Sequence, residues 1–327
     1  MEELTLADTN GIAILVPGAL HAHAAKRIDE RFRLIAIDKA DASLVTPEIA
    51  RDVRGVASMT SINAAFIDAL PNLEVIAHFG VGYDSVDAAH AGRRDVMVTN
   101  TPDVLTDEVA DTAVALLINT LRELPKAEAW LREGRWEREG GYRFSRGSLR
   151  GRRVGIFGMG RIGQAIARRL EGFGLPIAYH NRRQVEGVPY AYHDSLLGLA
   201  GAVDTLINVA PGGASTARAV NAEVLRALGA DGVLVNIGRG STVDQEALIA
   251  ALADGTIFAA GLDVFADEPH VPEALLALEN TSLLPHIGSA SVATREAMAD
   301  LLADNLVAWF TDGKPLTPVA ETVHVSR

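Results

Sequence analysis

The sequence predicts an α/β protein with two domains, each built on a doubly wound parallel sheet. One observation is the length of 327 residues, which exceeds the size at which a single hydrophobic core stops growing. The other is that short, continuous apolar runs alternate with helical patterns in both halves of the chain. Strands that are apolar at every position are typical of parallel sheets with helices on both faces.

The first half predicts five strands, at residues 12–16, 33–37, 53–59, 73–79 and 96–99. A long helix should follow, with Thr106 as its N-cap and with Asp107 and Glu108 in a first turn that favours acids. Pro125 should interrupt this helix. The polar segment 127–151 then carries four aromatic residues, which either serve an interface or a substrate, or pack on their own domain: Trp130, Trp136, Tyr142 and Phe144.

The second half predicts six strands, at residues 154–158, 176–180, 205–209, 233–237, 258–264 and 282–285. A last helix should run from Ser291 to Phe310 and stop at Gly313 and Pro315. Because this helix follows the final strand, it could return to the first half and make that domain discontinuous.

Composition narrows the class of protein. The chain is 48% hydrophobic and 22% charged, has no cysteine and carries a net charge of −12. It should therefore be globular, without disulfides or thiolate metal sites, and in a reducing compartment. The negative charge disfavours nucleic acid and anionic membranes, and no apolar run reaches the ~20 residues of a membrane span. We expect a cytoplasmic protein with no metal, nucleic-acid or membrane partner.

A glycine-rich loop indicates a dinucleotide site. Gly158, Gly160 and Gly163 form G-x-G-x-x-G between an apolar strand and an amphipathic helix. Gly158 permits the tight turn, Gly160 lets the backbone approach a pyrophosphate, and Gly163 allows close packing of helix and strand. Glycines that only turn the chain are the alternative. The loop expected to bind cofactor comprises Gly158, Met159, Gly160, Arg161, Ile162 and Gly163.

The end of the next strand indicates which dinucleotide binds. NAD sites place an acid there, about 20 residues after the first glycine. Here His180 lies 22 residues after Gly158 and is followed by Asn181, Arg182 and Arg183. Guanidinium groups bind a 2′-phosphate, which a carboxylate would repel. NADP(H) is therefore expected in preference to NAD(H), with a solvated basic turn as the alternative.

Three further strand-end segments carry polar residues: 235–240 with Arg239, 261–269 with Asp263 and Glu268, and 284–290 with His286. Ligands bind at the carboxyl ends of strands in open α/β sheets, so these segments should face one crevice. No G-x-S-x-G elbow and no H-E-x-x-H motif occurs, which leaves hydrolase and zinc-protease readings without support.

These segments, together with residues 79–87, residues 106–110 and the glycine loop, resemble the signature blocks of the D-isomer-specific 2-hydroxyacid dehydrogenase family over nearly the whole chain. The Asn-Arg-Arg turn and the Gly-Val-Gly-Tyr-Asp block are most similar to its NADPH-preferring glyoxylate/hydroxypyruvate reductase branch. The resemblance implies a Rossmann domain (101–287) inserted into a flavodoxin-like substrate-binding domain (1–100 plus 288–327), a homodimer, and reduction of a small 2-keto acid.

The resemblance also implies roles for residues. Arg239 would grip the substrate and polarise its carbonyl group, and His286 would donate a proton to the carbonyl oxygen. Glu268 would hydrogen-bond the imidazole, select its tautomer and favour its protonated form. The substrate pocket would include Ser58, Met59 and the amides near Val81 and Gly82. Further cofactor contacts would come from Thr106, Val209, Pro211, Ile237, Asp263, His286 and Gly288, although caps and turns also explain such residues.

Two rival functions remain open. One is a non-catalytic module that senses dinucleotide, because a fold does not prove an activity. The other is an enzyme of the same family that acts on a different acid, such as 2-ketogluconate, phenylpyruvate, phosphite, formate, D-lactate or phosphoglycerate. Formate dehydrogenases carry Gln where this chain has Glu268, and the lactate and phosphoglycerate enzymes usually have an acid at position 180.

Overall fold

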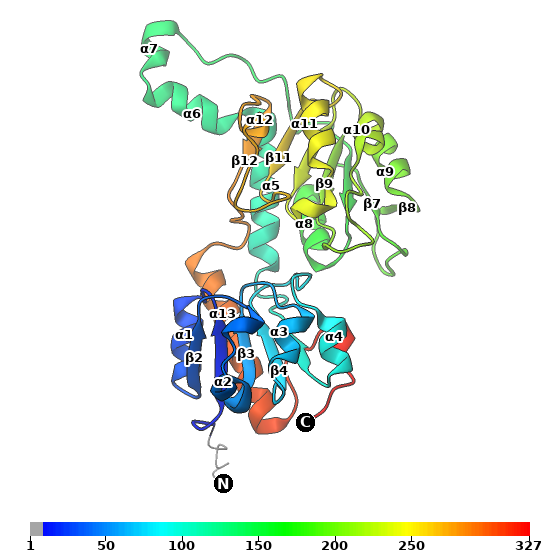
Figure 1. Cartoon of the computed structure of the whole chain (residues 1–327). Coiled ribbons are helices and arrows are strands. Elements are labelled where there is room, and N and C mark those ends of the chain that lie inside the picture. The colour runs from blue at the N-terminus through cyan, green and yellow to red at the C-terminus, as the bar shows by residue number, and fades with distance from the viewer. Residues whose placement is uncertain (1–8) are drawn as a thin grey trace, which may run out of the picture. The chain divides into compact units, whose positions relative to one another are not determined.

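The computed structural model describes residues 9–327. These divide into two compact units (Figure 1). The first ends at Leu105 and resumes with Ser291–Arg327, and the second is Thr106–Ala290. The sequence predicts the two boundaries between the domains nearby, at residues 100/101 and 287/288. In the structure both coincide with the starts of long helices, α5 (Thr106–Arg122) and α13 (Val292–Asp312), because a continuous helix belongs to a single unit.

The first unit contains a parallel sheet of five strands in the order β2-β1-β3-β4-β5. This is the 2-1-3-4-5 order of flavodoxin-like folds. All five predicted strands are confirmed: β2 has the predicted bounds, β1 is shifted by one residue, and the other three are slightly shorter. The five strands are β1 (Ala13–Pro17), β2 (Arg33–Ile37), β3 (Val53–Ser58), β4 (Val75–His78) and β5 (Met97–Thr99).

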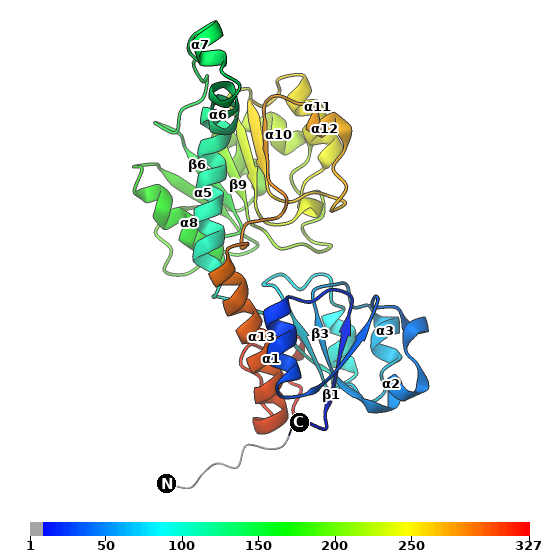
Figure 2. The ribbon, with the colours of Figure 1, turned by 90° about the vertical axis from the view of Figure 1, so that its left-hand side faces the viewer.

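Helices cover both faces of this sheet. Figure 2 shows α1 and α13 on one face and α2 and α3 on the other. Asn63 caps α3 through its side chain and Ser291 caps α13, which ends at Gly313 in the left-handed conformation, as the stop signal predicts. The helices are α1 (Ala22–Asp29), α2 (Pro47–Asp52), α3 (Ala64–Asp68), α4 (Ala88–Arg93) and α13 (Val292–Asp312), with 3-10 turns η1 (Ala42–Leu44) and η3 (Ala320–Thr322).

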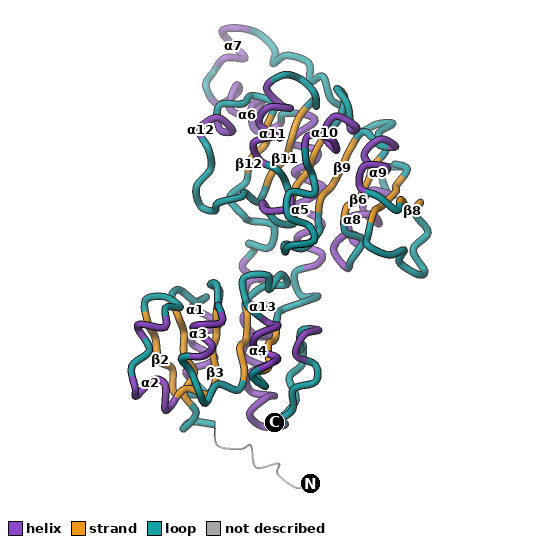
Figure 3. The backbone as a smooth tube through the Cα atoms, turned by 45° about the vertical axis from the view of Figure 1, so that its right-hand side comes forward, coloured by secondary structure: helices purple, strands orange, loops and turns teal. Residues whose placement is uncertain are grey.

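The second unit contains a parallel sheet of seven strands in the order β12-β11-β10-β9-β6-β7-β8 (Figure 3). Six match the predicted strands, and β8 was missed because it is a three-residue edge strand with no apolar run. The strand order reverses between β6 and β9, which is where open α/β sheets bind ligands. The strands are β6 (Val154–Phe157), β7 (Ile177–His180), β8 (Ala191–His193), β9 (Thr205–Asn208), β10 (Val233–Asn236), β11 (Ala259–Leu262) and β12 (Thr281–Leu283).

Helices again cover both faces of the sheet. Helices α5 and α8 pack together, while α9, α10 and α11 bury a separate apolar cluster. Thr106 is the first residue of α5 and not its N-cap, so this prediction was one residue late. The helices are α5 (Thr106–Arg122), α6 (Leu124–Arg132), α7 (Arg135–Glu139), α8 (Arg161–Glu171), α9 (Leu196–Ala202), α10 (Ala222–Leu228), α11 (Gln245–Ala253) and α12 (Glu273–Leu276), with the 3-10 turn η2 (Gly240–Thr242).

The aromatic residues of the segment that carries α6 and α7 fall into two groups, one packed within the segment and one exposed. Trp130 packs within the segment, because its Nε1 donates to the Gly140 carbonyl oxygen over 3.1 Å and its ring meets that of Tyr142 edge-on. Trp136 is 62% exposed and Phe144 is fully exposed. Among the described residues, no helix is both long and apolar enough to span a bilayer.

Candidate active site

The glycine loop between β6 and α8 has the geometry of a phosphate cradle. Gly158 has φ +103°, and a Cβ on Gly163 would lie 2.2 Å from the Gly158 oxygen, so the packing of the loop requires both glycines. A Cβ on Gly160, the N-cap of α8, would meet no protein atom within 4 Å. The space beside this helix N-terminus is therefore open, and the helix dipole favours an anion there.

The basic turn after β7 is tied to this loop. The Asn181 side chain accepts a hydrogen bond from the Met159 amide over 2.7 Å, and the Tyr192 hydroxyl donates to the Asn181 carbonyl oxygen over 3.2 Å. Arg182 and Arg183 are exposed, and no carboxylate of the described chain forms an ion pair with either. Both guanidinium groups are therefore available to an anionic ligand.

His286 and Glu268 form a hydrogen-bonded pair. The His286 Nδ1 atom lies 2.7 Å from the Glu268 Oε2 atom, and the Phe265 amide donates to Oε1 over 2.9 Å. Burial would raise the pKa of Glu268, but the bonds from His286 and Phe265 and the charge of Arg239 hold the pKa of this carboxyl below its usual value. Glu268 is therefore an ionised acceptor that fixes one nitrogen of the imidazole and leaves Nε2 for a ligand.

Asp263 fixes the backbone on either side of His286. Its carboxylate accepts from the amides of Ile287 and Gly288 over 2.7 and 2.8 Å, and its carbonyl oxygen accepts from the His286 amide over 2.9 Å. The side chain is only 1% exposed, and this burial raises its pKa despite the two amide donors. His286 has φ +53°, an uncommon conformation that these three bonds hold in place.

Arg239 lies at the carboxyl end of β10. Its Nη1 donates to the Gly238 carbonyl oxygen over 2.9 Å, and its charge lowers the pKa of Glu268. A Cβ on the next residue, Gly240, would lie 1.8 Å from the Phe265 oxygen. The loop carrying Arg239 therefore packs directly against the loop carrying Glu268.

The structure brings most of the predicted site residues together. The glycine loop, the basic turn and residues 209, 211, 237, 239, 263, 268, 286 and 288 all follow the carboxyl ends of strands in the second unit. Val209 and Ile237 continue β9 and β10, since their amides donate to the oxygens of Phe157 and Asn208. Thr106 is half-buried at the start of α5.

The four predicted pocket residues lie in the first unit: Ser58 ends β3, Met59 follows it, and Val81 and Gly82 come after β4. Ser58 is 1% exposed and its hydroxyl accepts from the Thr60 amide, so it shapes the turn, whereas Met59 is 38% exposed. The Val81 carbonyl oxygen accepts a bond from the Asn100 side chain over 2.8 Å, and Gly82 follows it in the same loop. Their roles stay predictions.

Sequence reasoning missed a group of buried polar residues behind Arg239. Asn208 and Asn236 are the last residues of β9 and β10, and Thr242 ends η2. Hydrogen bonds connect all three. The signal that could have revealed them is an asparagine at the same place in two neighbouring, otherwise apolar strands. Among the described residues, no cluster of three or more His, Cys, Asp or Glu could hold a metal ion.

Comparison with known proteins gives concordant matches. The model of the D-isomer specific 2-hydroxyacid dehydrogenase, NAD binding domain, matches residues 114–288. Hydroxyphenylpyruvate reductase of Plectranthus scutellarioides is 43% identical over 313 residues, covering 94% of this chain and 99% of that protein. A glyoxylate/hydroxypyruvate reductase A of Arabidopsis thaliana is 42% identical over 311 residues, with the same coverage.

A solved structure extends the likeness to three dimensions. The NADPH-dependent glyoxylate/hydroxypyruvate reductase of Sinorhizobium meliloti, crystallised with NADP and malonate, is 59% identical and has a TM-score of 0.95. The match covers 97% of this chain and 99% of that one. By its family match, its near-complete relatives and its fold, the chain belongs to the D-isomer-specific 2-hydroxyacid dehydrogenase family.

Proposed function

We propose that this protein reduces small 2-keto acids, glyoxylate and hydroxypyruvate, to D-2-hydroxy acids with NADPH. The observation that carries the proposal is the pair of His286 and Glu268, 2.7 Å apart, beside the loop of Arg239. This pairing supplies a proton donor with a fixed orientation next to a cation that binds carboxylates. The reductase names of the relatives support the same chemistry.

The described residues fit an NADP(H) molecule. The open space at Gly160 and the N-terminus of α8 suit a pyrophosphate, and the exposed Arg182 and Arg183 suit a 2′-phosphate. The S. meliloti relative was crystallised with NADP. When bound, the dinucleotide supplies the hydride that reduces C2 of the acid. The contacts predicted for Thr106, Val209, Pro211, Ile237, Asp263 and Gly288 are part of this proposal.

The chain's own residues bind the acid and supply the proton. The planar guanidinium of Arg239 binds the carboxylate of the acid and polarises its C2 carbonyl group. Glu268 accepts the Nδ1 proton of His286, which turns Nε2 toward the carbonyl oxygen, and Nε2–H donates the proton. In the oxidation of the hydroxy acid, the same nitrogen takes the proton back. Ser58, Met59, Val81 and Gly82 are proposed to shape the pocket.

A larger substrate is the second candidate. One relative with 94% coverage of this chain is named a hydroxyphenylpyruvate reductase, so an aryl pyruvate is a specific alternative to a two- or three-carbon acid. 2-Ketogluconate is another larger acid, and its turnover would likewise require a larger substrate pocket. A module that binds dinucleotide without turnover is the remaining alternative.

The proposal extends to assembly and location. We expect a homodimer, for which the exposed Trp136 of α7 and Phe144 after this helix offer apolar surface. A cytoplasmic location remains a prediction from the cysteine-free composition. The net charge of −12 continues to disfavour nucleic acid as a partner.

Initial rates of NADPH and NADH oxidation test cofactor and substrate together. The acids are glyoxylate, hydroxypyruvate, pyruvate, phenylpyruvate and 2-ketogluconate. Fast turnover of glyoxylate and hydroxypyruvate with NADPH supports the proposal. A preference for phenylpyruvate or 2-ketogluconate would select the second candidate, and NADPH binding without turnover of any acid would select the non-catalytic module.

A further inference from the structure

Three buried polar side chains lie behind the loop of Arg239. Asn208, Asn236 and Thr242 are 0%, 1% and 0% exposed. Burying a polar group costs free energy unless it finds partners, so the partners show what such residues hold in place. The Asn208 Nδ2 atom donates to the Asn236 Oδ1 atom over 3.1 Å and to the Thr242 Oγ1 atom over 2.6 Å.

These bonds converge on the carbonyl oxygen of Arg239. It accepts from the Thr242 hydroxyl over 2.6 Å, from the Asn236 Nδ2 atom over 3.0 Å and from the Thr242 amide over 3.3 Å. A hydroxyl has one proton. Because Thr242 accepts from Asn208, its proton is directed to Arg239, and Asn208 thereby sets the orientation of the hydroxyl.

The same unit fixes the entry to the loop. The Asn236 Oδ1 atom accepts from the Gly238 amide over 3.1 Å, and the Gly238 carbonyl oxygen in turn accepts from the Arg239 Nη1 atom. The backbone on both sides of the Arg239 Cα is therefore held, and the allowed rotamers of a side chain depend on its backbone. These bonds therefore help to set the direction of the Arg239 guanidinium. Asn208, Asn236 and Thr242 are all uncharged, so they do this through hydrogen bonds alone.

We propose that Thr242, oriented by Asn208 and supported by Asn236, is a positioning residue that directs the Arg239 guanidinium toward the substrate acid. The inference rests on the reductase function proposed above. Arg239 must bind an acid whose carbonyl group also meets His286, and Gly240 already packs without spare space against Phe265. A misplacement of 1 Å in such a site can cost about 100-fold in rate.

The test compares Thr242→Val with Thr242→Ser. Valine keeps the volume and removes the hydroxyl, whereas serine restores the hydroxyl. We expect Thr242→Val to raise KM for glyoxylate and lower kcat/KM at least about tenfold, with the dissociation constant of NADPH within about twofold. Thr242→Ser should recover most of the loss. Thermal melts of each variant report on folding.

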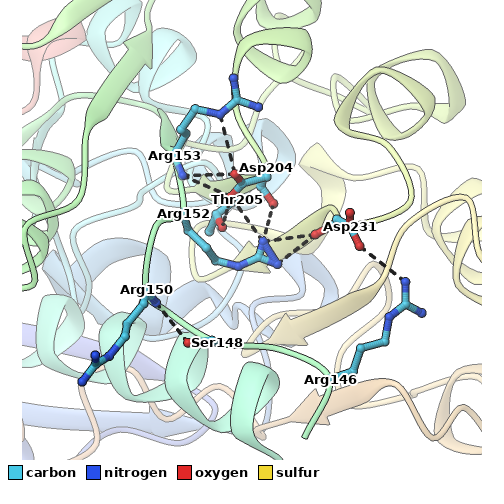
Figure 4. Close-up of polar contacts among 8 residues, drawn as sticks. All are labelled: Arg146, Ser148, Arg150, Arg152, Arg153, Asp204, Thr205 and Asp231. Carbon is cyan, nitrogen blue, oxygen red and sulfur yellow. Dashed lines mark hydrogen bonds and ion pairs between the residues drawn. The ribbon is translucent and has the colours of Figure 1, made fainter.

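Thr205→Val is the matched control. Thr205 is also 0% exposed and lies on β9, but near its amino end, where its hydroxyl donates to the Asp204 carboxylate over 3.1 Å. Figure 4 shows that Asp204 also accepts from Arg152 and Arg153, a cluster that joins strand starts and not the site. Thr205→Val should lower the melting temperature and leave KM for glyoxylate unchanged.

Three results would overturn the positioning role. They are a Thr242→Val enzyme within about twofold of the parent in kcat/KM, a loss of NADPH binding that parallels the loss of activity, and a serine variant no better than valine. If the parent enzyme reduces no acid, the proposed function is wrong, and this result does not bear on the positioning role of Thr242. Calorimetric binding of oxalate to the NADPH complex then tests Thr242 without turnover, and equal affinity in parent and Thr242→Val contradicts the inference.

Discussion

The Nδ1 atom of His286 lies 2.7 Å from the Oε2 atom of Glu268, and 18 residues separate the two along the chain. Asp263 holds the backbone beside the histidine, and the Phe265 amide holds the other oxygen of the glutamate. Hydrogen bonds within the protein therefore hold the pair in this geometry. A proton donor with a preset orientation needs no rearrangement during the reaction.

Glu268→Gln should lower kcat for 2-keto acid reduction about 10- to 100-fold and leave NADPH affinity nearly unchanged. Glutamine keeps the shape but offers His286 a neutral partner. Because the lowered pKa of Glu268 keeps its carboxylate ionised even below the ordinary value of 4.5, the defect should persist from about pH 5 to about pH 8. The measurement is kcat against pH for both enzymes.

Glu246→Gln is the control for this variant, because Glu246 is exposed on α11 in the same unit. It should behave as the parent. A Glu268→Gln enzyme with the parent's kcat would remove Glu268 from its role.

Replacing both Arg182 and Arg183 by Ala should weaken NADPH binding at least about 100-fold and change NADH binding little. Hydrogen bonds to charged groups contribute about 1.5–3 kcal/mol each, and only NADPH carries the 2′-phosphate. Fluorescence titration with both dinucleotides measures the ratio. Arg226→Ala, on an exposed position of α10, is the control. An equal loss for NADPH and NADH would contradict the assignment.

Gly160→Ala should separate cofactor binding from folding. The added methyl group meets no protein atom within 4 Å, and Gly160 has φ −81°, which alanine adopts freely. The melting temperature should stay near that of the parent, while NADPH affinity falls at least about tenfold, because the methyl group occupies the space of the pyrophosphate. Gly201→Ala in α9, where the methyl group also meets nothing, should leave NADPH affinity unchanged and raise the melting temperature slightly, because alanine favours the helix. Unchanged NADPH affinity of Gly160→Ala would place the pyrophosphate elsewhere.

The sequence predicts much of this molecule for identifiable reasons. Strands buried on both faces are continuously apolar, and ligand-binding residues follow their carboxyl ends, so Arg239, Glu268 and His286 could be found from strand position and residue type. The glycine loop was recognisable because a strand precedes it and a helix follows it. The resemblance to a family added roles that spacing alone does not give.

Other features depend on contacts that no local pattern encodes. The distance between His286 and Glu268 is set by bonds to Asp263 and Phe265, and the orientation of Thr242 depends on Asn208, 34 residues earlier. The ion pairs between α1 and α13 join residues 273 to 277 positions apart. Strand β8 pairs with β7 at the sheet edge, with only three residues to signal it.

Asp300→Asn should show how the ion pairs between α1 and α13 make the free energy of unfolding depend on pH. The Asp300 carboxylate meets His23 at 2.8 Å and Arg27 at 2.5 Å. Its slight burial would raise its pKa, but these two partners lower it below 3.8. A carboxylate with a lowered folded-state pKa stabilises the fold above its unfolded pKa, and this contribution disappears as the pH falls through the folded pKa.

The free energy of unfolding of Asp300→Asn should therefore be lower than the parent's by about 1 kcal/mol at neutral pH, a small value because the side chains are partly exposed. The difference should shrink below pH 3.8. Urea unfolding at several pH values measures it, with Glu296→Gln on an exposed position of the same helix as control. A difference that grows toward acid would contradict the assignment.

Trp136→Ala should weaken the proposed homodimer. The side chain is 62% exposed, and it lines a pocket of about 340 Å³ with Leu131, Gly134 and Glu137. Trp130, by contrast, is engaged with Gly140 and with Arg135, whose guanidinium lies 3.6 Å from its ring centre, and so contributes less free surface.

Tryptophans buried at interfaces commonly contribute about 2 kcal/mol or more, which corresponds to a dissociation constant raised at least about thirtyfold. Sedimentation equilibrium measures this constant, and Phe173→Ala, at another exposed apolar residue of the same unit, is the control. A monomeric parent, or a Trp136→Ala dimer as tight as the parent's, would show that Trp136 does not serve an interface between copies of this chain.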